Sequence, residues 1–240
     1  MFVRRLTATL GLSVVALGCY AESQHFARLP SLSQPQFRLM SEDLGAALSY
    51  KPITPPSPLG TSGFDVGFEV SATRLTHPQA YQLATDSSRD TLYTPRLHLH
   101  KGLPYGFDIG ASFGTLPGSD VRLIGAEARY ALVPDNLFLP TLGLRASYST
   151  LRGSEWLEVN TRGVDLSVSK GFSLFTPYAG VGSVWVDSDP YEGLGLARER
   201  FQHEKYFIGA NFNLRLMNFA VEADRTGDTT SYHAKFGWRW

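Results

Sequence analysis

From Phe64 to the C-terminus, apolar and polar residues alternate along most of the chain. In the first run, Phe64, Val66 and Phe68 are each followed by a polar residue or by glycine. Alternation with a period of two predicts a β-strand with one apolar face and one polar face. Runs of this kind cover residues 64–73, 96–100, 105–114, 124–132, 142–149, 164–169, 206–215, 219–224 and 232–240.

Residues 177–187 also predict a strand, but the sequence does not assign its two faces. Val181 and Trp185 stand on one side, whereas Val184 and Val186 stand on the other. With this segment the chain holds about ten strands, and many reach the roughly 9–11 residues that cross a bilayer at a tilt.

The joins between the predicted strands alternate in character. Counted from a periplasmic N-terminus, the even-numbered joins are short or turn-like and fall at residues 102–104, 134–140, 170–175 and 216–218. The odd-numbered joins include the two longest and most polar segments, Thr76–Asp90 and Ser188–Gln202. Outer-membrane barrels have an even number of strands, short periplasmic turns and longer outer loops. An even count therefore returns the C-terminus to the periplasm.

Two kinds of barrel fit this alternation, because the pattern does not say which face points outward. A soluble barrel of the lipocalin type has its apolar face inside, whereas a membrane barrel reverses the arrangement. The polar face here is rich in Gly, Ser and Asn with mixed charges, rather than in the Lys and Glu of a solvated surface. Aromatic residues near strand ends on the apolar face are Tyr93, Tyr105, Phe113, Tyr130, Tyr148, Tyr206 and Trp238. They predict an aromatic girdle at each membrane interface, and the expected fold class is an all-β, transmembrane, antiparallel up-and-down barrel.

The composition narrows the classes of function. The 240 residues carry 22 Lys and Arg against 22 Asp and Glu, so the formal net charge is zero. A neutral chain argues against nucleic acid as a partner, because neutralising phosphates needs a basic surface. The single Cys rules out a disulfide scaffold and any metal site built from a cysteine cluster. No Gly-rich phosphate loop appears, and we expect no cofactor.

The first 21 residues have the pattern of a secretory signal peptide. Arg4 and Arg5 precede an apolar stretch at residues 6–17 that is too short to span a bilayer, and Ala21 stands at the expected cleavage position. The alternative is a lipoprotein, in which Cys19 would be lipidated. Either interpretation exports the chain, and we expect it in the outer membrane of a Gram-negative bacterium.

Residues 22–62 form a segment of different composition. Its prolines exclude one long strand or helix across the segment, and they are Pro30, Pro35, Pro52, Pro55, Pro56 and Pro58. Ser41 is predicted to cap a short helix that ends at Leu48. We expect the segment to be periplasmic or to plug the lumen, with disorder as the alternative. Residues 63–240 then form the barrel.

The last strand carries a resemblance to a known group. Bacterial outer-membrane β-barrel proteins commonly end on an alternating strand with a final aromatic residue, which the barrel-assembly machinery reads. Tyr232, Phe236, Trp238 and Trp240 resemble that assembly signal, with Trp in place of the usual final Phe. Together with residues 1–21, the resemblance implies an outer-membrane barrel of the OmpA/OmpX-like group. It also implies outer-membrane lipid and the assembly machinery as partners. Such barrels serve structural, adhesive, channel and enzymatic roles, so the fold does not choose among them.

The charged and histidine residues of the polar face are expected to line the lumen. They are Asp65, Glu69, Arg96, His98, His100, Asp108, Glu127, Arg129, Arg145, Asp165, Arg215, Glu222, Asp224, Lys235 and Arg239. A charge-selective pore would carry an excess of one sign, whereas this set is nearly balanced. Balanced charges pair across a narrow, closed lumen, because a desolvated charge must find a partner. We therefore expect a structural ion-pair network rather than a selectivity filter.

His98 and His100 lie two residues apart on one strand face, a spacing that suits metal ligation or catalysis. No complete set of nucleophile, base and orienting residue appears with supporting spacing. We therefore expect no catalytic residue and no metal site. The predicted function is a structural or narrow-channel barrel with no chemistry of its own. The alternatives are a passive pore for small polar solutes, a hydrolase that uses these histidines, and an adhesin that acts through the two long loops.

Overall fold

Ten antiparallel strands form a ring in which each strand pairs with its sequence neighbours, and β1 closes the ring against β10. We describe a computed structural model, which covers residues 26–240 except 86, 118, 120 and 134–138. The strands are β1 Phe64–Arg74, β2 Thr91–Gly102, β3 Phe107–Thr115, β4 Arg122–Val133, β5 Thr141–Arg152, β6 Leu157–Ser169, β7 Phe175–Pro190, β8 Glu199–Leu214, β9 Met217–Thr226 and β10 Thr229–Arg239. The predicted up-and-down barrel of about ten strands is confirmed. The predicted signal peptide with Cys19, and most of the join at 134–140, lie outside the described residues.

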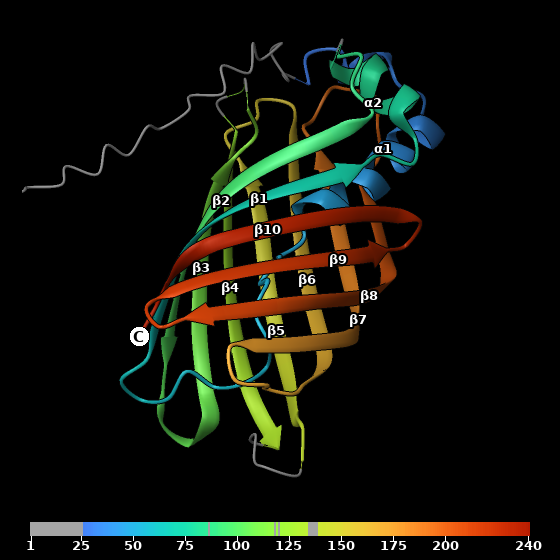
Figure 1. The fold of residues 1–240 in the computed structure, drawn as a ribbon. Coiled ribbons are helices and arrows are strands. Elements are labelled where there is room, and N and C mark those ends of the chain that lie inside the picture. The colour runs from blue at the N-terminus through green and yellow to red at the C-terminus, as the bar shows by residue number, and fades with distance from the viewer. Residues whose placement is uncertain (1–25, 86, 118, 120, 134–138) are drawn as a thin grey trace, which may run out of the picture.

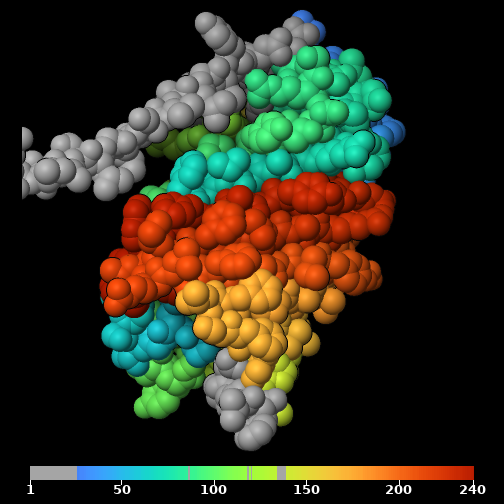
Figure 2. Space-filling view, in the orientation of Figure 1, coloured from blue at the N-terminus to red at the C-terminus, as the bar shows by residue number. Residues whose placement is uncertain are grey.

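Apolar side chains point outward from the barrel. Phe68 is 54% exposed, whereas the next residue, Glu69, is fully buried. The ladder places Phe68 beside Phe236 and Glu69 beside Lys235, so neighbouring strands turn the same face outward. An apolar exterior around a polar interior reverses the arrangement of a soluble barrel and is the arrangement of a transmembrane barrel. The space-filling view shows an unbroken outer wall across the strands that face the viewer (Figure 2).

The two ends of the barrel differ. At the short-turn end lie the joins 103–106, 170–174 and 215–216 together with the C-terminus. At the long-loop end lie the joins 75–90, 116–121, 153–156, 191–198 and 227–228. Figure 1 shows helices α1 (Gln34–Leu48) and α2 (Pro78–Thr85) at the end away from the C-terminus. Two short 3₁₀ turns complete the elements, η1 (Leu29–Ser31) and η2 (Pro104–Gly106).

Three predicted boundaries at the joins need correction. The expected loop Ser188–Gln202 is shorter, because β7 continues to Pro190 and β8 begins at Glu199. The expected loop Thr76–Asp90 contains α2, a helix that was not predicted. Tyr105 lies in the turn η2 with a φ of 63°, so it is not a residue of the strand face.

Helix α1 is longer than predicted. It begins after Ser33, whose backbone N–H donates to Gln36 Oε1 at 2.9 Å, and not at Ser41. Pro35 falls in the first turn, where the missing N–H costs nothing because first-turn N–H groups lack helical partners. The proline that argued against a helix therefore helps to start one. None of the helices in the described part of the chain is long and apolar enough to cross a membrane.

Helix α1 packs inside the long-loop end of the barrel. Its buried face of Phe37, Met40 and Leu44 joins a core with inward residues of the strands, including Val184 and Val186. Gly45 lies directly against Val186, because a Cβ added there would be 2.5 Å from Val186 Cγ2. This packing explains the ambiguous faces of residues 177–187. The inward side of β7 is apolar at this end because it faces α1 rather than the polar lumen.

Candidate functional site

The N-terminal segment runs through the lumen from one end to the other. After α1, residues 49–56 are all buried and form neither helix nor strand. Farther along, the Leu59 N–H donates to Asp108 Oδ1 at 3.1 Å, and β1 then begins at Phe64 at the short-turn end. Helix α1 and residues 49–59 together are called the lumen segment below. They occupy the space that a channel would need.

Arginines of the barrel wall bind the backbone of the lumen segment. Arg96 donates to the carbonyl oxygens of Ala47 at 2.8 Å and Ser49 at 3.3 Å. Two further arginines bind the segment lower down, since Arg145 donates to Thr54 O at 3.3 Å and Arg129 donates to Pro55 O at 3.2 Å. Irregular backbone in a water-poor interior needs such donors, because an unpaired buried carbonyl is costly. The arginines therefore hold the segment in place rather than line an open pore.

One charged side chain of the lumen segment pairs with the wall deep inside. Lys51 Nζ lies 2.8 Å from Asp224 Oδ2, and both side chains are fully buried. Asp224 also accepts a hydrogen bond from His233 Nε2 at 2.5 Å, and Thr226 Oγ1 donates to it at 2.9 Å. A buried carboxylate with three partners is compensated in charge and in hydrogen bonds.

The remaining wall charges form a network of ion pairs. Glu69 meets Arg96 at 3.7 Å and is hydrogen-bonded to His98 Nε2. Further pairs include Asp65 with Lys235 (2.7 Å) and Arg239, Asp108 with Arg129 (3.0 Å), Glu127 with Arg129 (3.4 Å), Arg145 (3.2 Å) and His100 (3.2 Å), and Asp165 with Arg145 (3.3 Å). His98 and His100 stack with ring centroids 5.7 Å apart. Glu222 also lies on the wall and accepts a hydrogen bond from Tyr178 at 2.9 Å. Fourteen of the fifteen residues predicted to line the lumen are thus placed on its wall.

The exception is Arg215, whose predicted place in the lumen is wrong. It lies in the tight turn between β8 and β9, is exposed, and has a φ of 61°. The alternation of β8 ends before this residue because the chain reverses there. Conversely, sequence reasoning missed Lys205, which is buried and lies 3.6 Å from Asp165. Extending the alternation of residues 206–215 by one position would have found it.

Residues 49–59 of the lumen segment carry one charged side chain, Lys51, which complements the charges of the wall. Seven buried acids of the strands are Asp65, Glu69, Asp108, Glu127, Asp165, Glu222 and Asp224. Six cations of the strands contact them, namely Arg96, Arg129, Arg145, Lys205, Lys235 and Arg239. The wall alone therefore carries one acid more than cations in this set. Lys51 of the lumen segment supplies the seventh cation.

Ser71, His233 and Asp224 are linked in a hydrogen-bonded chain, but the Ser71 hydroxyl donates to Glu69 and not to the histidine, unlike the nucleophile of a serine hydrolase. Ser71 Oγ lies 2.7 Å from His233 Nδ1, and His233 Nε2 lies 2.5 Å from Asp224 Oδ2. A nucleophile must also reach substrate, and the Ser71 side chain is fully buried. In this conformation the chain joins strand β1 to β9 and β10 and offers no access for a substrate.

Glu222, Asp224 and His233 also lie close enough together to hold a metal ion. Asp224 already binds the ammonium group of Lys51 at 2.8 Å. A lysine ammonium in that place supplies the positive charge that a metal ion would bring. The residues therefore fit an ion-pair network better than a metal centre.

Assembly-signal residues Tyr232, Phe236 and Trp238 point outward from β10, and Trp240 follows the strand beside Phe64. Their proposed recognition by an assembly machine stays a prediction.

Comparison with known proteins finds only remote similarity. No protein-family model matches the chain, and no curated protein matches it. Among solved structures, the KdgM porin in complex with disordered oligogalacturonate is 9% identical with a TM-score of 0.38, over 72% of this chain and 98% of that chain. The outer membrane protease OmpT from Escherichia coli is 11% identical with a TM-score of 0.38, over 74% and 95%. Ail, the attachment invasion locus protein of Yersinia pestis, is 11% identical with a TM-score of 0.31, over 74% and 98%. The closed ring of ten strands with its apolar exterior gives this chain the fold of an outer-membrane β-barrel protein.

Proposed function

We propose that the protein is an outer-membrane barrel whose lumen is closed by its own N-terminal segment, with a structural role and no chemistry of its own. The observation that carries the proposal is the course of residues 49–59 through the lumen, where Arg96, Arg129 and Arg145 bind the backbone and Asp224 binds Lys51. A solute cannot share that space with a buried chain. Export by a signal peptide, insertion through the barrel-assembly machinery and an outer-membrane location belong to the same proposal.

The charge balance supports closure as the resting state. Withdrawal of the lumen segment would take the Lys51 ammonium away from the Asp224 carboxylate. It would also expose the apolar inward residues Val184 and Val186 to water. Both changes are unfavourable, so the segment is expected to remain in place without an external force or ligand.

A gated narrow channel is the second candidate. It is favoured by the polar wall that lies behind the lumen segment, which would line a water-filled passage if the segment moved. In that case residues 49–59 would act as a gate rather than as a permanent filling. The two candidates differ only in whether the segment leaves the lumen.

Single-channel recordings with a locked segment separate these possibilities. Ser41 Oγ of α1 lies 2.9 Å from Ser188 Oγ of β7, so Ser41→Cys with Ser188→Cys gives a pair suited to a disulfide. The refolded full-length variant is recorded in a planar bilayer before and after reduction. We expect no conductance steps in either state.

Conductance in either state would change the proposed function. Steps that appear only after reduction would establish the gated channel. Steps in the oxidised, locked protein would overturn closure and favour a passive pore. Heat-modifiable migration of each sample confirms that the barrel is folded.

A further inference from the structure

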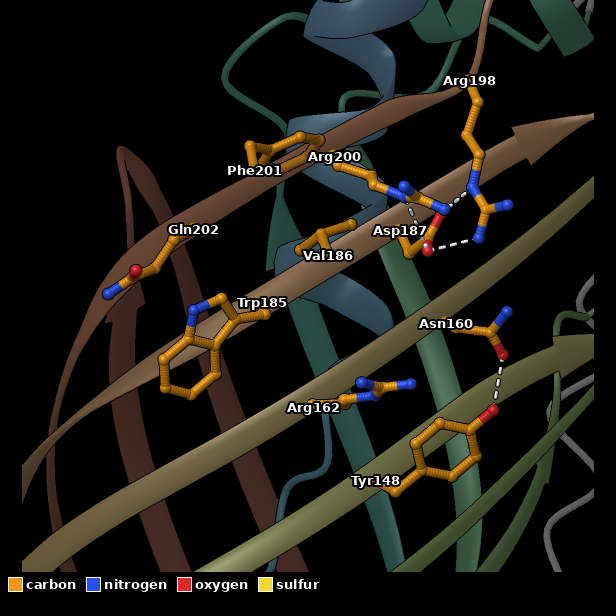
Figure 3. A pocket seen from close by; sticks show the side chains of 10 residues that line it. All are labelled: Tyr148, Asn160, Arg162, Trp185, Val186, Asp187, Arg198, Arg200, Phe201 and Gln202. Atoms are coloured by element: carbon orange, nitrogen blue, oxygen red, sulfur yellow. Dashed lines mark hydrogen bonds and ion pairs between the residues drawn. The ribbon is translucent and has the colours of Figure 1, made fainter.

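A cleft opens on the outer wall of the barrel near the long-loop end. It has a volume of about 650 Å³ and lies across β5 to β8. Its lining includes Tyr148, Arg162, Trp185, Arg198 and Arg200, and Figure 3 shows how they lie. The ladder places Arg162 between Tyr148 on β5 and Trp185 on β7. The cleft therefore combines three guanidinium groups with the exposed aromatic rings of Tyr148 and Trp185.

The guanidinium groups are partly fixed and partly available. Asp187 holds Arg198, whose Nε donates at 2.5 Å, and Arg200, whose Nε donates at 3.2 Å. Asp189 holds the other side of Arg198 at 3.1 Å. Arg200 remains 67% exposed, and Arg162 is exposed with no hydrogen-bond or ion-pair partner among the described residues. Two arginines can thus donate to an incoming anion.

An apolar groove continues from the cleft toward the middle of the barrel. Its volume is about 460 Å³, and Leu144, Val164, Leu166 and Val181 line it. Trp185 belongs to both the groove and the cleft. An indole at the boundary between an apolar and a polar zone is typical of a membrane interface. The two hollows together have the shape and chemistry of a site for one amphiphile.

We propose that this outer-wall site binds a phosphate-bearing lipid of the outer leaflet, with the headgroup at Arg162 and Arg200 and an acyl chain in the groove below Trp185. Guanidinium groups recognise phosphate by paired, charge-assisted hydrogen bonds. The acyl chain would cover side chains that are otherwise exposed, namely Leu144, Val164 and Val181. A soluble anion would use the arginines but not the groove. The inference rests on the proposed outer-membrane location.

Calorimetric titration of the full-length protein in non-ionic detergent tests the site. The probes are lipopolysaccharide, its dephosphorylated form, phosphatidylglycerol and inorganic phosphate. We expect lipopolysaccharide to bind and the dephosphorylated form to bind at least about tenfold more weakly, because a charge-assisted hydrogen bond is lost. Phosphatidylglycerol is expected to bind more weakly than lipopolysaccharide, and inorganic phosphate is expected to show no saturable binding.

Two variants locate the binding. Arg162→Gln is expected to weaken lipopolysaccharide binding about tenfold. Arg74→Gln is the matched control, since Arg74 is also exposed at the long-loop end and has no ion pair among the residues that the structure describes, but lies on β1, on the other side of the ring. Control binding within about twofold of the wild type supports the site. Equal losses in both variants would overturn it in favour of diffuse attraction to surface charge.

A protein that fractionates with the outer membrane and folds in detergent, yet binds no glycolipid, overturns only the lipid site. A protein recovered as soluble material would overturn the membrane location and the lipid site together.

Discussion

Lys51 Nζ lies 2.8 Å from Asp224 Oδ2 in the middle of the barrel, and neither side chain is exposed to solvent. The two residues are 173 positions apart in the chain. The lysine comes from the lumen segment and the aspartate from β9, so this ion pair ties the contents of the barrel to its wall.

Replacing Lys51 alone should destabilise the protein strongly. Lys51→Met leaves the Asp224 carboxylate buried without its cation, and removing one member of a buried pair costs about 3–5 kcal/mol. The free energy of unfolding, measured by urea titration in detergent micelles, is expected to fall by that amount.

The matched control neutralises both partners. Lys51→Met combined with Asp224→Asn removes the unpaired charge while keeping the volume similar, and it should recover most of the loss. A double variant as unstable as the single one would show that the pair does not carry this energy.

Gly45 should resist a larger side chain because of one neighbour. The Cβ of Gly45→Ala would lie 2.5 Å from Val186 Cγ2, and such overpacking costs about 1–3 kcal/mol. Alanine favours a helix by up to about 1 kcal/mol over glycine. In a Val186→Ala background the two clashing methyl groups are absent and the nearest atom is the Cβ of residue 186 at 3.2 Å, so the same change should cost much less. Thermal midpoints of the four proteins measure the coupling; additive effects would contradict the packing.

Replacing Tyr81 of α2 by phenylalanine should stabilise the protein. Its hydroxyl is buried with no hydrogen-bond partner among the described residues, and its ring packs on Phe26. Tyr81→Phe is expected to raise the free energy of unfolding by about 1 kcal/mol, because an unsatisfied polar group is removed.

The stability of the protein at alkaline pH tests the burial of Tyr81 independently. Burial raises the pKa of Tyr81 above its ordinary value. The stability held by its neutral form is therefore complete below the unfolded pKa of about 10 and is lost as the pH rises above it. Thermal scans between pH 8 and 11 should show a smaller alkaline loss in Tyr81→Phe than in the wild type. An equal loss would mean that Tyr81 reaches solvent.

The hydrogen bonds that link Ser71, His233 and Asp224 should have a structural role rather than form an active site. Ser71 Oγ is fully buried, so a serine-reactive fluorophosphonate is expected to leave the folded protein unlabelled. Mass spectrometry of the treated protein makes the test, and a modified Ser71 would reopen the hydrolase alternative.

The sequence was sufficient for the parts of the fold that depend on local pattern. Alternation identified the strands and the two faces of each, because a residue's side of a strand follows from its position alone, and the Gly, Ser and Asn content of the polar face indicated that this face points inward. It failed where an inward residue meets something other than the polar lumen. Val184 and Val186 face α1, so the inward side of β7 is apolar there and the strand ends were misplaced.

The partners within the lumen could not be predicted, because alternation identifies a face but not a register. Nothing local links His233 to Ser71 or Lys51 to Asp224. Arg215 was misplaced because a two-residue reversal after Leu214 interrupts an otherwise regular pattern. The sequence does not reveal the start of α1, because Pro35 predicts a break in a helix, although a proline in the first turn is favourable.

The position of the lumen segment is the central claim, and a disulfide formed in cells tests it most directly. Ser41→Cys with Ser188→Cys joins residues whose hydroxyl oxygens are 2.9 Å apart. The control pairs Ser41→Cys with Ser167→Cys. Ser167 is also buried and inward, but it lies eight residues along β6 from Val159, the ladder partner of Ser188, or about 26 Å away.

We predict that the first pair forms a disulfide in the outer-membrane fraction without added oxidant, seen as a faster band that a reductant abolishes, and that the control pair does not. Free, alkylatable thiols at both positions 41 and 188 of the folded protein would contradict the account, because α1 would then lie outside the barrel.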